Sequence, residues 1–185
     1  LWGEFLAVPE TRLNVLEDGQ PLQIGEHTFL PLDTPGHANH HFAYLFQDAC
    51  FSGDIGGVRI PGAPYLRVPM PPPEFHLPSW RASLARLREA SPRQLVPTHF
   101  GPFADVGWHL GELERSLDRI EAWLEELMPS DPELDEINRR FVAWMDQQAA
   151  EAGLAQSMRA AFEAANPSRM SSADMQRYRR KFRQG

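Results

Sequence analysis

Residues 34–54 read TPGHANHHFAYLFQDACFSGD, and this stretch decides the fold because it alternates short apolar runs with polar residues at their ends. Two apolar runs, residues 41–46 and 50–52, are separated by a short turn segment, which predicts a β-hairpin. His37 precedes this hairpin and Asp54 follows it. Polar residues in this position are typical of sites built on loops at the ends of strands.

The segments on either side of this stretch extend the sheet and then interrupt it. Upstream, residues 22–24 and 27–32 are apolar and β-branched runs punctuated by glycines, which predicts a second strand pair. Downstream, residues 56–78 are dense in Pro and Gly and include three consecutive prolines. Because proline lacks an N–H and fixes φ, we expect a long ordered loop there.

The rest of the chain is predicted to be mainly helical. A helix begins near Pro78, ends before Pro92 and leads to a strand at 94–96. A longer helix from Trp108 carries an apolar stripe at steps of three and four. The stripe consists of Leu110, Leu113, Leu117, Ile120, Leu124 and Leu127. Further helices are expected over 134–153, 154–165 and 172–182. The predicted organisation is an α/β domain over 1–128 and a helical C-terminal extension over 129–185.

Composition limits the function classes. With 185 residues and 42% hydrophobic content, the chain is long enough to bury one sizeable core. No run approaches the roughly 20 apolar residues of a membrane helix, and residues 1–10 lack an export signal pattern, so no membrane association is expected. Cys50 is the single cysteine and cannot form an internal disulfide, which favours a reducing cytoplasm.

The charge is unevenly distributed. The net charge of -7 opposes broad nucleic-acid affinity, because duplex binding needs Lys and Arg to neutralise phosphates. Residues 168–185 nevertheless hold six basic residues against one acid, Asp174. The basic residues are Arg169, Arg177, Arg179, Arg180, Lys181 and Arg183. We interpret them as a solvated helix face.

Three polar signals follow predicted strands: residues 34–37 (TPGH), 52–54 (SGD) and 97–102 (PTHFGP). Imidazole nitrogen and carboxylate oxygen are the usual donors to zinc and similar divalent ions. Each signal alone is weak, because a lone His in a turn is more often a hydrogen-bonded surface residue. Their order is more specific than any one of them.

The succession from T-P-G-H through a hairpin into F-S-G-D, and then through a helix and a strand into T-H-F-G-P, resembles the later part of the metallo-β-lactamase superfamily. The likeness covers roughly residues 11–128 and extends to glyoxalase-II-like hydrolases with a helical appendage. It implies part of a four-layer αβ/βα sandwich. It also implies a site for one or two divalent ions, zinc or alternatively iron or manganese, with His37 and His99 as ligands. Asp54 would be both the bridging ligand and the catalytic carboxylate.

The activity that the resemblance implies is metal-assisted hydrolysis. Bound water, acidified from a pKa of about 15.7 towards about 7, would attack an ester, thioester or related bond as hydroxide. Family members carry an H-x-H-x-D-H motif before T-P-G-H, and none of the seven histidines has that spacing. We therefore expect the chain to lack the N-terminal half of the domain. As given, it is expected to bind metal weakly and to be a poor hydrolase.

Four more residues are candidates for the surroundings of the site. Because neighbouring residues in a strand point to opposite faces, at most one of His40 and His41 can face the metal. His40 is the candidate, either as a hydrogen-bond partner of a metal ligand or as a substitute ligand. In the proline-rich loop, Arg59, Tyr65 and Arg67 form a candidate substrate-pocket wall. An Arg there would suit a small-molecule substrate with an anionic group.

Two other functions remain open. The chain could be a non-catalytic domain used for binding or assembly, with the helical extension forming a homodimer interface. Alternatively, it could be a nucleic-acid-processing phosphodiesterase of the same superfamily, which the basic tail favours and the overall acidity opposes. Metal content and hydrolysis of an ester and phosphodiester panel would separate these functions from a small-molecule hydrolase.

Overall fold

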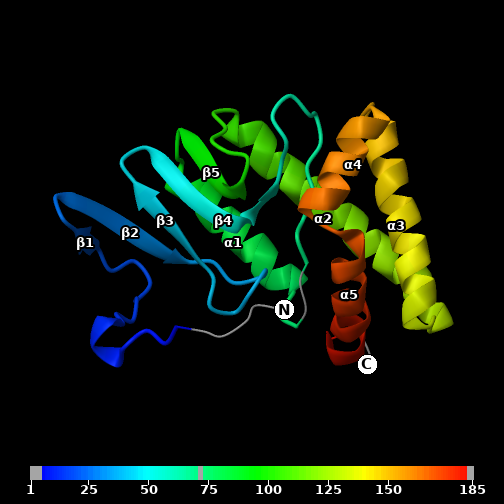
Figure 1. The fold of residues 1–185 in the computed structure, drawn as a ribbon, viewed down its shortest axis with the longest axis horizontal. Coiled ribbons are helices and arrows are strands. Elements are labelled where there is room, and N and C mark those ends of the chain that lie inside the picture. The colour runs from blue at the N-terminus through cyan, green and yellow to red at the C-terminus, as the bar shows by residue number, and fades with distance from the viewer. Residues whose placement is uncertain (1–5, 71–72, 183–185) are drawn as a thin grey trace.

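The computed structural model describes residues 6–70 and 73–182. Its centre is a five-stranded sheet in the order β1-β2-β3-β4-β5 (Figure 1). Neighbouring strands from β1 to β4 are antiparallel, and β5 is parallel to β4. The strands are β1 (Leu22–Ile24), β2 (His27–Asp33), β3 (Phe42–Phe46), β4 (Ala49–Val58) and β5 (Gln94–His99).

The predicted hairpin is present, but its second strand is longer than expected. Gln47, with φ 54°, turns β3 into β4, and Leu45 then pairs with Cys50. β4 continues to Val58, so the first residues of the predicted loop are in fact strand. The β-structure persists because β5 lies beside this part of β4, pairing Gly53 with Pro97 and Val58 with His99.

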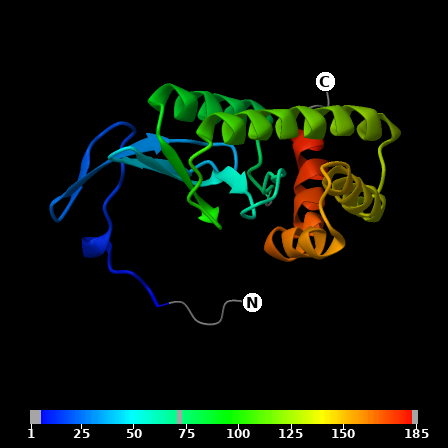
Figure 2. The same ribbon diagram turned by 90° about the horizontal axis from the view of Figure 1, so that it is seen from above.

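Two helices, α1 (Leu77–Ala90) and α2 (Val106–Leu127), pack along the same face of the sheet (Figure 2). His76 caps α1 by accepting a hydrogen bond at Nδ1 from the N–H of Ser79, and a proline stands in the first turn, as predicted. The apolar stripe of α2 is buried along its whole length, which confirms the predicted packing. Preceding α1 and α2, a 3₁₀ turn, η1, spans Glu10–Arg12.

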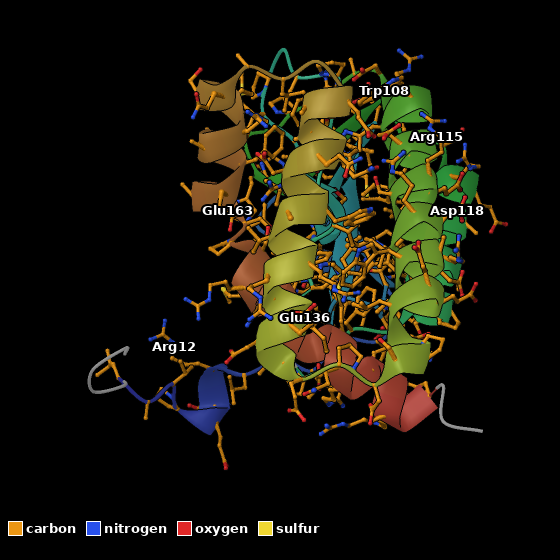
Figure 3. The ribbon with its side chains drawn as sticks, turned by 90° about the vertical axis from the view of Figure 1, so that its right-hand side faces the viewer. Arg12, Trp108, Arg115, Asp118, Glu136 and Glu163 are labelled. Carbon is orange, nitrogen blue, oxygen red and sulfur yellow. The ribbon has the colours of Figure 1, made fainter. Side chains whose placement is uncertain are left out.

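The helical extension comprises α3 (Leu134–Glu151), α4 (Gln156–Ala165) and α5 (Ser168–Phe182), after the 3₁₀ turn η2 (Met128–Ser130). α3 lies between α2 and α4 on the side of the molecule shown in Figure 3. Trp123 of α2 contacts the rings of Phe141 and Trp144 of α3. Tyr178 of α5 contacts Phe75, just before α1. α3 and α5 therefore share the main hydrophobic core with the sheet and its helices, while Phe162 of α4 packs in a second cluster with Tyr65.

The architecture is mixed α/β, as the sequence predicts: a five-stranded sheet with helices followed by a helical extension. In the described part of the chain, none of the helices combines the length and apolar character needed to cross a membrane. Among the predicted basic tail residues, Arg183 lies outside the described residues.

Candidate metal centre

His37, Asp54 and His99 converge at one end of the sheet. His37 Nε2 lies 3.4 Å from Asp54 Oδ2, and His99 Nε2 lies 3.7 Å from Asp54 Oδ1. Two imidazole nitrogens therefore face the two oxygens of one carboxylate. The three residues come from the loop after β2, from β4 and from the end of β5, so the sheet brings together positions far apart in the sequence.

The loop that carries His37 is held against the start of α1. A Cβ on Gly36 would lie 2.6 Å from the backbone of Trp80, so a larger residue cannot fit there, and its φ of +137° also favours glycine. The N–H of His76 donates to Gly36 O at 2.9 Å, and Ser83 Oγ donates to Pro35 O at 2.6 Å. These contacts explain why the T-P-G-H segment needs its glycine.

A hydrogen bond fixes which nitrogen of His37 faces the carboxylate. His37 Nδ1 lies 3.0 Å from Pro69 O, and a carbonyl oxygen only accepts, so Nδ1 is the protonated donor. In a neutral ring, Nε2 then presents a lone pair towards Asp54. Two lone-pair groups at 3.4 Å repel each other unless a proton or a cation lies between them. Metal-binding histidines are commonly oriented by a hydrogen bond of this kind, from the other ring nitrogen to a carbonyl oxygen.

Asp54 is positioned through its backbone by His41. His41 Nε2 accepts a hydrogen bond from the N–H of Asp54 at 3.2 Å, while its Nδ1 is 2.9 Å from Thr34 Oγ1. A Cβ on Gly53 would lie 2.5 Å from His41 Nε2, so glycine there leaves room for the ring. Gly53 also has a positive φ of +55°, which favours glycine.

The supporting role expected of His40 is taken by His41, which contacts the Asp54 backbone. The His40 side chain is 88% exposed, and its Nδ1 lies 3.7 Å from Glu74. His41 is mostly enclosed, and burial together with the nearby His37 lowers its pKa from 6.5 to about 4. The neutral ring can therefore accept the hydrogen bond from Asp54. Alternation along β3 points to His41, because it lies two residues before the buried Ala43 and so shares its face of the strand.

His99 is the most open of the three residues, with 38% of its side chain exposed at the end of β5. Phe100 follows with a φ of +61°, which turns the chain sharply away from the strand. Gly101 then lies so close to Pro97 that an added Cβ would meet the proline ring at 2.7 Å. The H-F-G-P segment is thus a compact turn that presents His99 to solvent.

The donor set fits a divalent ion in chemistry and in pairwise spacing. An ion bound tetrahedrally at about 2.1 Å separates its donors by about 3.4 Å, close to the two distances measured to Asp54. Within residues 6–70 and 73–182, no three His, Cys, Asp or Glu side chains are grouped tightly enough to hold an ion as they stand. The three donors as a group are therefore spread more widely than a bound ion requires. The longer of the two distances to Asp54 is the one from His99.

The three residues line a cavity of about 210 Å³. Its remaining walls come from β4 and the following loop and from the extension around the α4–α5 turn (Asn166 and Pro167). They are Val58, Pro69, Met70, Ala165, Asn166, Pro167, Met170 and Ser171. The helical extension thus closes one side of the candidate site, a role that its sequence does not reveal.

The three residues expected in a substrate-pocket wall do not line this cavity. Arg59 pairs with Asp105 at 2.7 Å and lies over the rings of Phe103 and Trp108. The Tyr65 ring is buried against Phe162 of α4. Their apolar contacts and ion pairs hold the loop onto α2 and the extension instead of exposing these side chains to a substrate.

Arg67 is also turned away from the cavity, with 3% of its side chain exposed. Its NH1 group donates to Glu163 Oε2 at 2.8 Å and to the carbonyl oxygen of Asn166 at 3.1 Å. The charge that was expected to receive an anionic substrate is therefore neutralised by an acid of the extension.

Comparison with known proteins finds partial similarity to metallo-β-lactamase fold proteins. No protein-family model matches the chain. A curated metallo-β-lactamase fold-containing protein of Sulfurisphaera tokodaii is 30% identical over 86 residues. The match covers 46% of this chain and 32% of the relative, so the chain spans about a third of that relative's length.

Solved structures give partial matches. The match to a metallo-β-lactamase superfamily protein from Sulfolobus tokodaii covers 60% of this chain and 41% of that protein, with 24% identity and a TM-score of 0.49. The match to a metallo-β-lactamase family protein from Thermus thermophilus covers 62% of this chain and 37% of that protein, with 27% identity and a TM-score of 0.48. The curated relative and these solved structures are metallo-β-lactamase fold proteins, and their likeness to this chain covers about half of it.

Proposed function

We propose that this chain carries a metal site of a metal-dependent hydrolase that acts on a small ester, thioester or related substrate. The observation that carries the proposal is the arrangement of His37 Nε2 and His99 Nε2 on the two oxygens of Asp54. Lone pairs and a carboxylate that face one another in this way are stabilised by a positive charge between them, and a divalent ion with nitrogen and oxygen ligands would supply it.

His37, Asp54 and His99 would hold the ion, and three protein donors with one open position is the usual set for catalytic zinc. Iron or manganese would suit the same nitrogen and oxygen donors. When bound, such an ion makes water a better nucleophile near neutral pH and polarises the bond to be cleaved.

The protein's own contribution is orientation and proton transfer. The Nδ1–H of His37 donates to Pro69 O, which keeps the ring and its Nε2 lone pair in one orientation. His41 holds the backbone of Asp54, so a carboxylate oxygen is in place to accept a proton from an attacking water. The exposed ring of His99 leaves this end of the cavity open to water.

The lining of the cavity favours a small substrate over a nucleic acid. The described residues that form its wall include no Arg or Lys. Phosphate backbones are recognised chiefly by such cations. The basic groove of α5, lined by Gln176, Arg177, Arg180 and Lys181, is a separate surface. The observations therefore support the small-molecule hydrolase rather than the phosphodiesterase.

The test is to measure bound zinc, iron and manganese in the purified protein and its turnover of neutral para-nitrophenyl esters and of bis-para-nitrophenyl phosphate. We expect slow ester turnover that depends on added metal and is lost in Asp54→Asn. An exposed-site control, Asp48→Asn, should retain it. Metal-independent turnover, or turnover equal in Asp54→Asn, would overturn the proposal.

A further inference from the structure

A large apolar side chain of the extension is exposed at the wall of the cavity. Met170, in the first turn of α5, lines the cavity together with His37, Asp54 and His99, and the residue is 55% exposed. Its N–H donates to Pro167 O at 3.0 Å, where the chain turns into the helix. Because moving apolar surface out of water is favourable, an apolar occupant of the cavity would gain free energy by covering Met170.

The residues around Met170 continue this apolar surface from the extension to the sheet. Pro167 belongs to the α4–α5 turn, Met70 to the loop after β4, and Val58 is the last residue of β4. In Figure 1 and in Figure 2, the end of β4 points towards α4 and α5. The amide nitrogen of Asn166, in the same wall, is shielded from water and adds no donor to it. The candidate ligands therefore face a largely apolar wall.

The start of α5 is held in place by an ion pair. Arg67 NH1 donates to Glu163 Oε2 at 2.8 Å and to the carbonyl oxygen of Asn166 at 3.1 Å. The N–H and the hydroxyl of Ser168 also donate to Glu163, at 2.8 Å and 2.7 Å. Glu163 is labelled on α4 in Figure 3. These bonds fix the backbone just before Met170, so the side chain is presented from one position although it is exposed.

The size and chemistry of the cavity limit what can lie against Met170. Its volume of about 210 Å³ is smaller than the roughly 300–1,000 Å³ of pockets that hold drug-sized ligands, so it admits a short chain. The described lining residues beyond the three candidate ligands include no charged side chain, so a polar group placed there would lose water without gaining a partner. Methionine is unbranched and polarisable, and it adapts its shape to a flexible hydrocarbon chain.

From these observations we infer that Met170 determines substrate specificity: it contacts the acyl chain of a short ester or thioester and selects an apolar chain over a polar or charged one. The leaving group then departs past the exposed ring of His99, at the open end of the cavity. This inference rests on the proposed hydrolase function and names its substrate class. It reverses the expectation of an anionic substrate, because Arg67 is engaged by Glu163.

The kinetic test uses para-nitrophenyl acetate, valerate and β-methoxypropionate. The last has the length of valerate, with an ether oxygen in place of one methylene. With excess metal, kcat/KM should be at least about fourfold higher for valerate than for β-methoxypropionate, as one buried methylene implies. Met170→Gln keeps the chain length and helix propensity but places an amide against the acyl chain. The ratio should then approach one through a higher KM for valerate, and acetate turnover should change less. A valerate preference that survives in Met170→Gln would overturn the inference.

Two further variants separate contact with the acyl chain from damage to the fold. Met170→Leu keeps an apolar side chain and should retain most of the valerate preference. If it loses the preference as fully as Met170→Gln, the apolar character of Met170 does not select the chain and the inference is wrong. Leu134→Gln, at an apolar position on α3 that is 37% exposed, should keep the wild-type ratio.

A binding measurement separates this inference from the proposed function. In metal-free protein with isotope-labelled methionine methyl groups, the NMR signal of Met170, assigned by its absence from Met170→Leu, should shift with methyl valerate and shift less with methyl β-methoxypropionate. The signals of Met145 and Met175, which are buried and do not line the cavity, should stay fixed. If the Met170 signal shifts without ester turnover, the inference about chain binding stands and the hydrolase proposal fails. A Met170 signal that methyl valerate leaves unmoved overturns the inference, whether or not the esters are turned over.

Discussion

The ring of His41 supports the backbone of Asp54: its Nε2 accepts the Asp54 N–H at 3.2 Å across the start of the hairpin. The hydrogen bond links the T-P-G-H loop, through Thr34, to the strand that carries the carboxylate. Orientation of a ligand by such an outer contact changes metal affinity by about 10–100-fold in other sites.

His41→Phe should therefore weaken zinc binding by about tenfold or more, because the Asp54 backbone loses its acceptor while the ring volume is kept. The measurement is a zinc titration with a competing chromophoric chelator. His40→Phe is the matched control, because His40 is exposed beside Glu74. Equal losses in both variants would mean that the His41 hydrogen bond does not position Asp54.

Gly53→Ala should destabilise the fold by about 1–3 kcal/mol, since the new Cβ would meet the His41 ring and the residue has a positive φ. Urea unfolding measures the free energy of unfolding. Gly107→Ala is the control, because a Cβ there meets no atom within 4 Å and alanine favours the helix, so stability should rise slightly. A neutral result at Gly53 would contradict the close approach of His41.

Leu117→Ala should cost about 2–5 kcal/mol, because Leu117 is fully buried in the stripe of α2 and its removal leaves a cavity. Thermal unfolding is the readout. Leu134→Ala, at a position that is 37% exposed, should have a much smaller effect. An unchanged melting temperature in Leu117→Ala would contradict the packing of α2 against the core.

Stability should decline as the pH falls below about 6.5, partly because of His109. Burial lowers the pKa of His109, although its bond to Gly56 O, 2.7 Å from Nε2, acts in the opposite direction, and Arg59 lowers the pKa further. The unfolded chain then binds more protons than the folded chain between the lowered pKa and the ordinary value of 6.5. His109→Gln should flatten this part of the stability–pH curve, whereas an unchanged slope would exclude the contribution of His109.

Much of the fold could be predicted because it depends on local signals, whereas the convergence of the three candidate ligands was expected from the resemblance of their segments to a known family. The three-and-four spacing of the α2 stripe and the turn at Gln47 are properties of short segments. The T-P-G-H and S-G-D glycines are needed for close approaches to Trp80 and His41, which explains why these short motifs were informative.

The surroundings of the site could not be predicted, because they depend on contacts between distant segments. Arg67 looks like a loop cation in the sequence, but it meets Glu163, 96 residues later, and is buried. Asn166 carries no motif and reaches the cavity only because the extension folds back over the site. The length of β4 likewise depends on pairing with β5.

The most direct test of the metal site is calorimetric titration of the metal-free protein with zinc, for the wild type and for His37→Ala, Asp54→Ala and His99→Ala. We expect the wild type to bind one zinc per chain weakly, because three donors hold it, and each variant to lose measurable binding, with His40→Ala unchanged. Binding that persists in all three variants, or a wild-type protein that takes up no zinc, would contradict a metal centre formed by His37, Asp54 and His99.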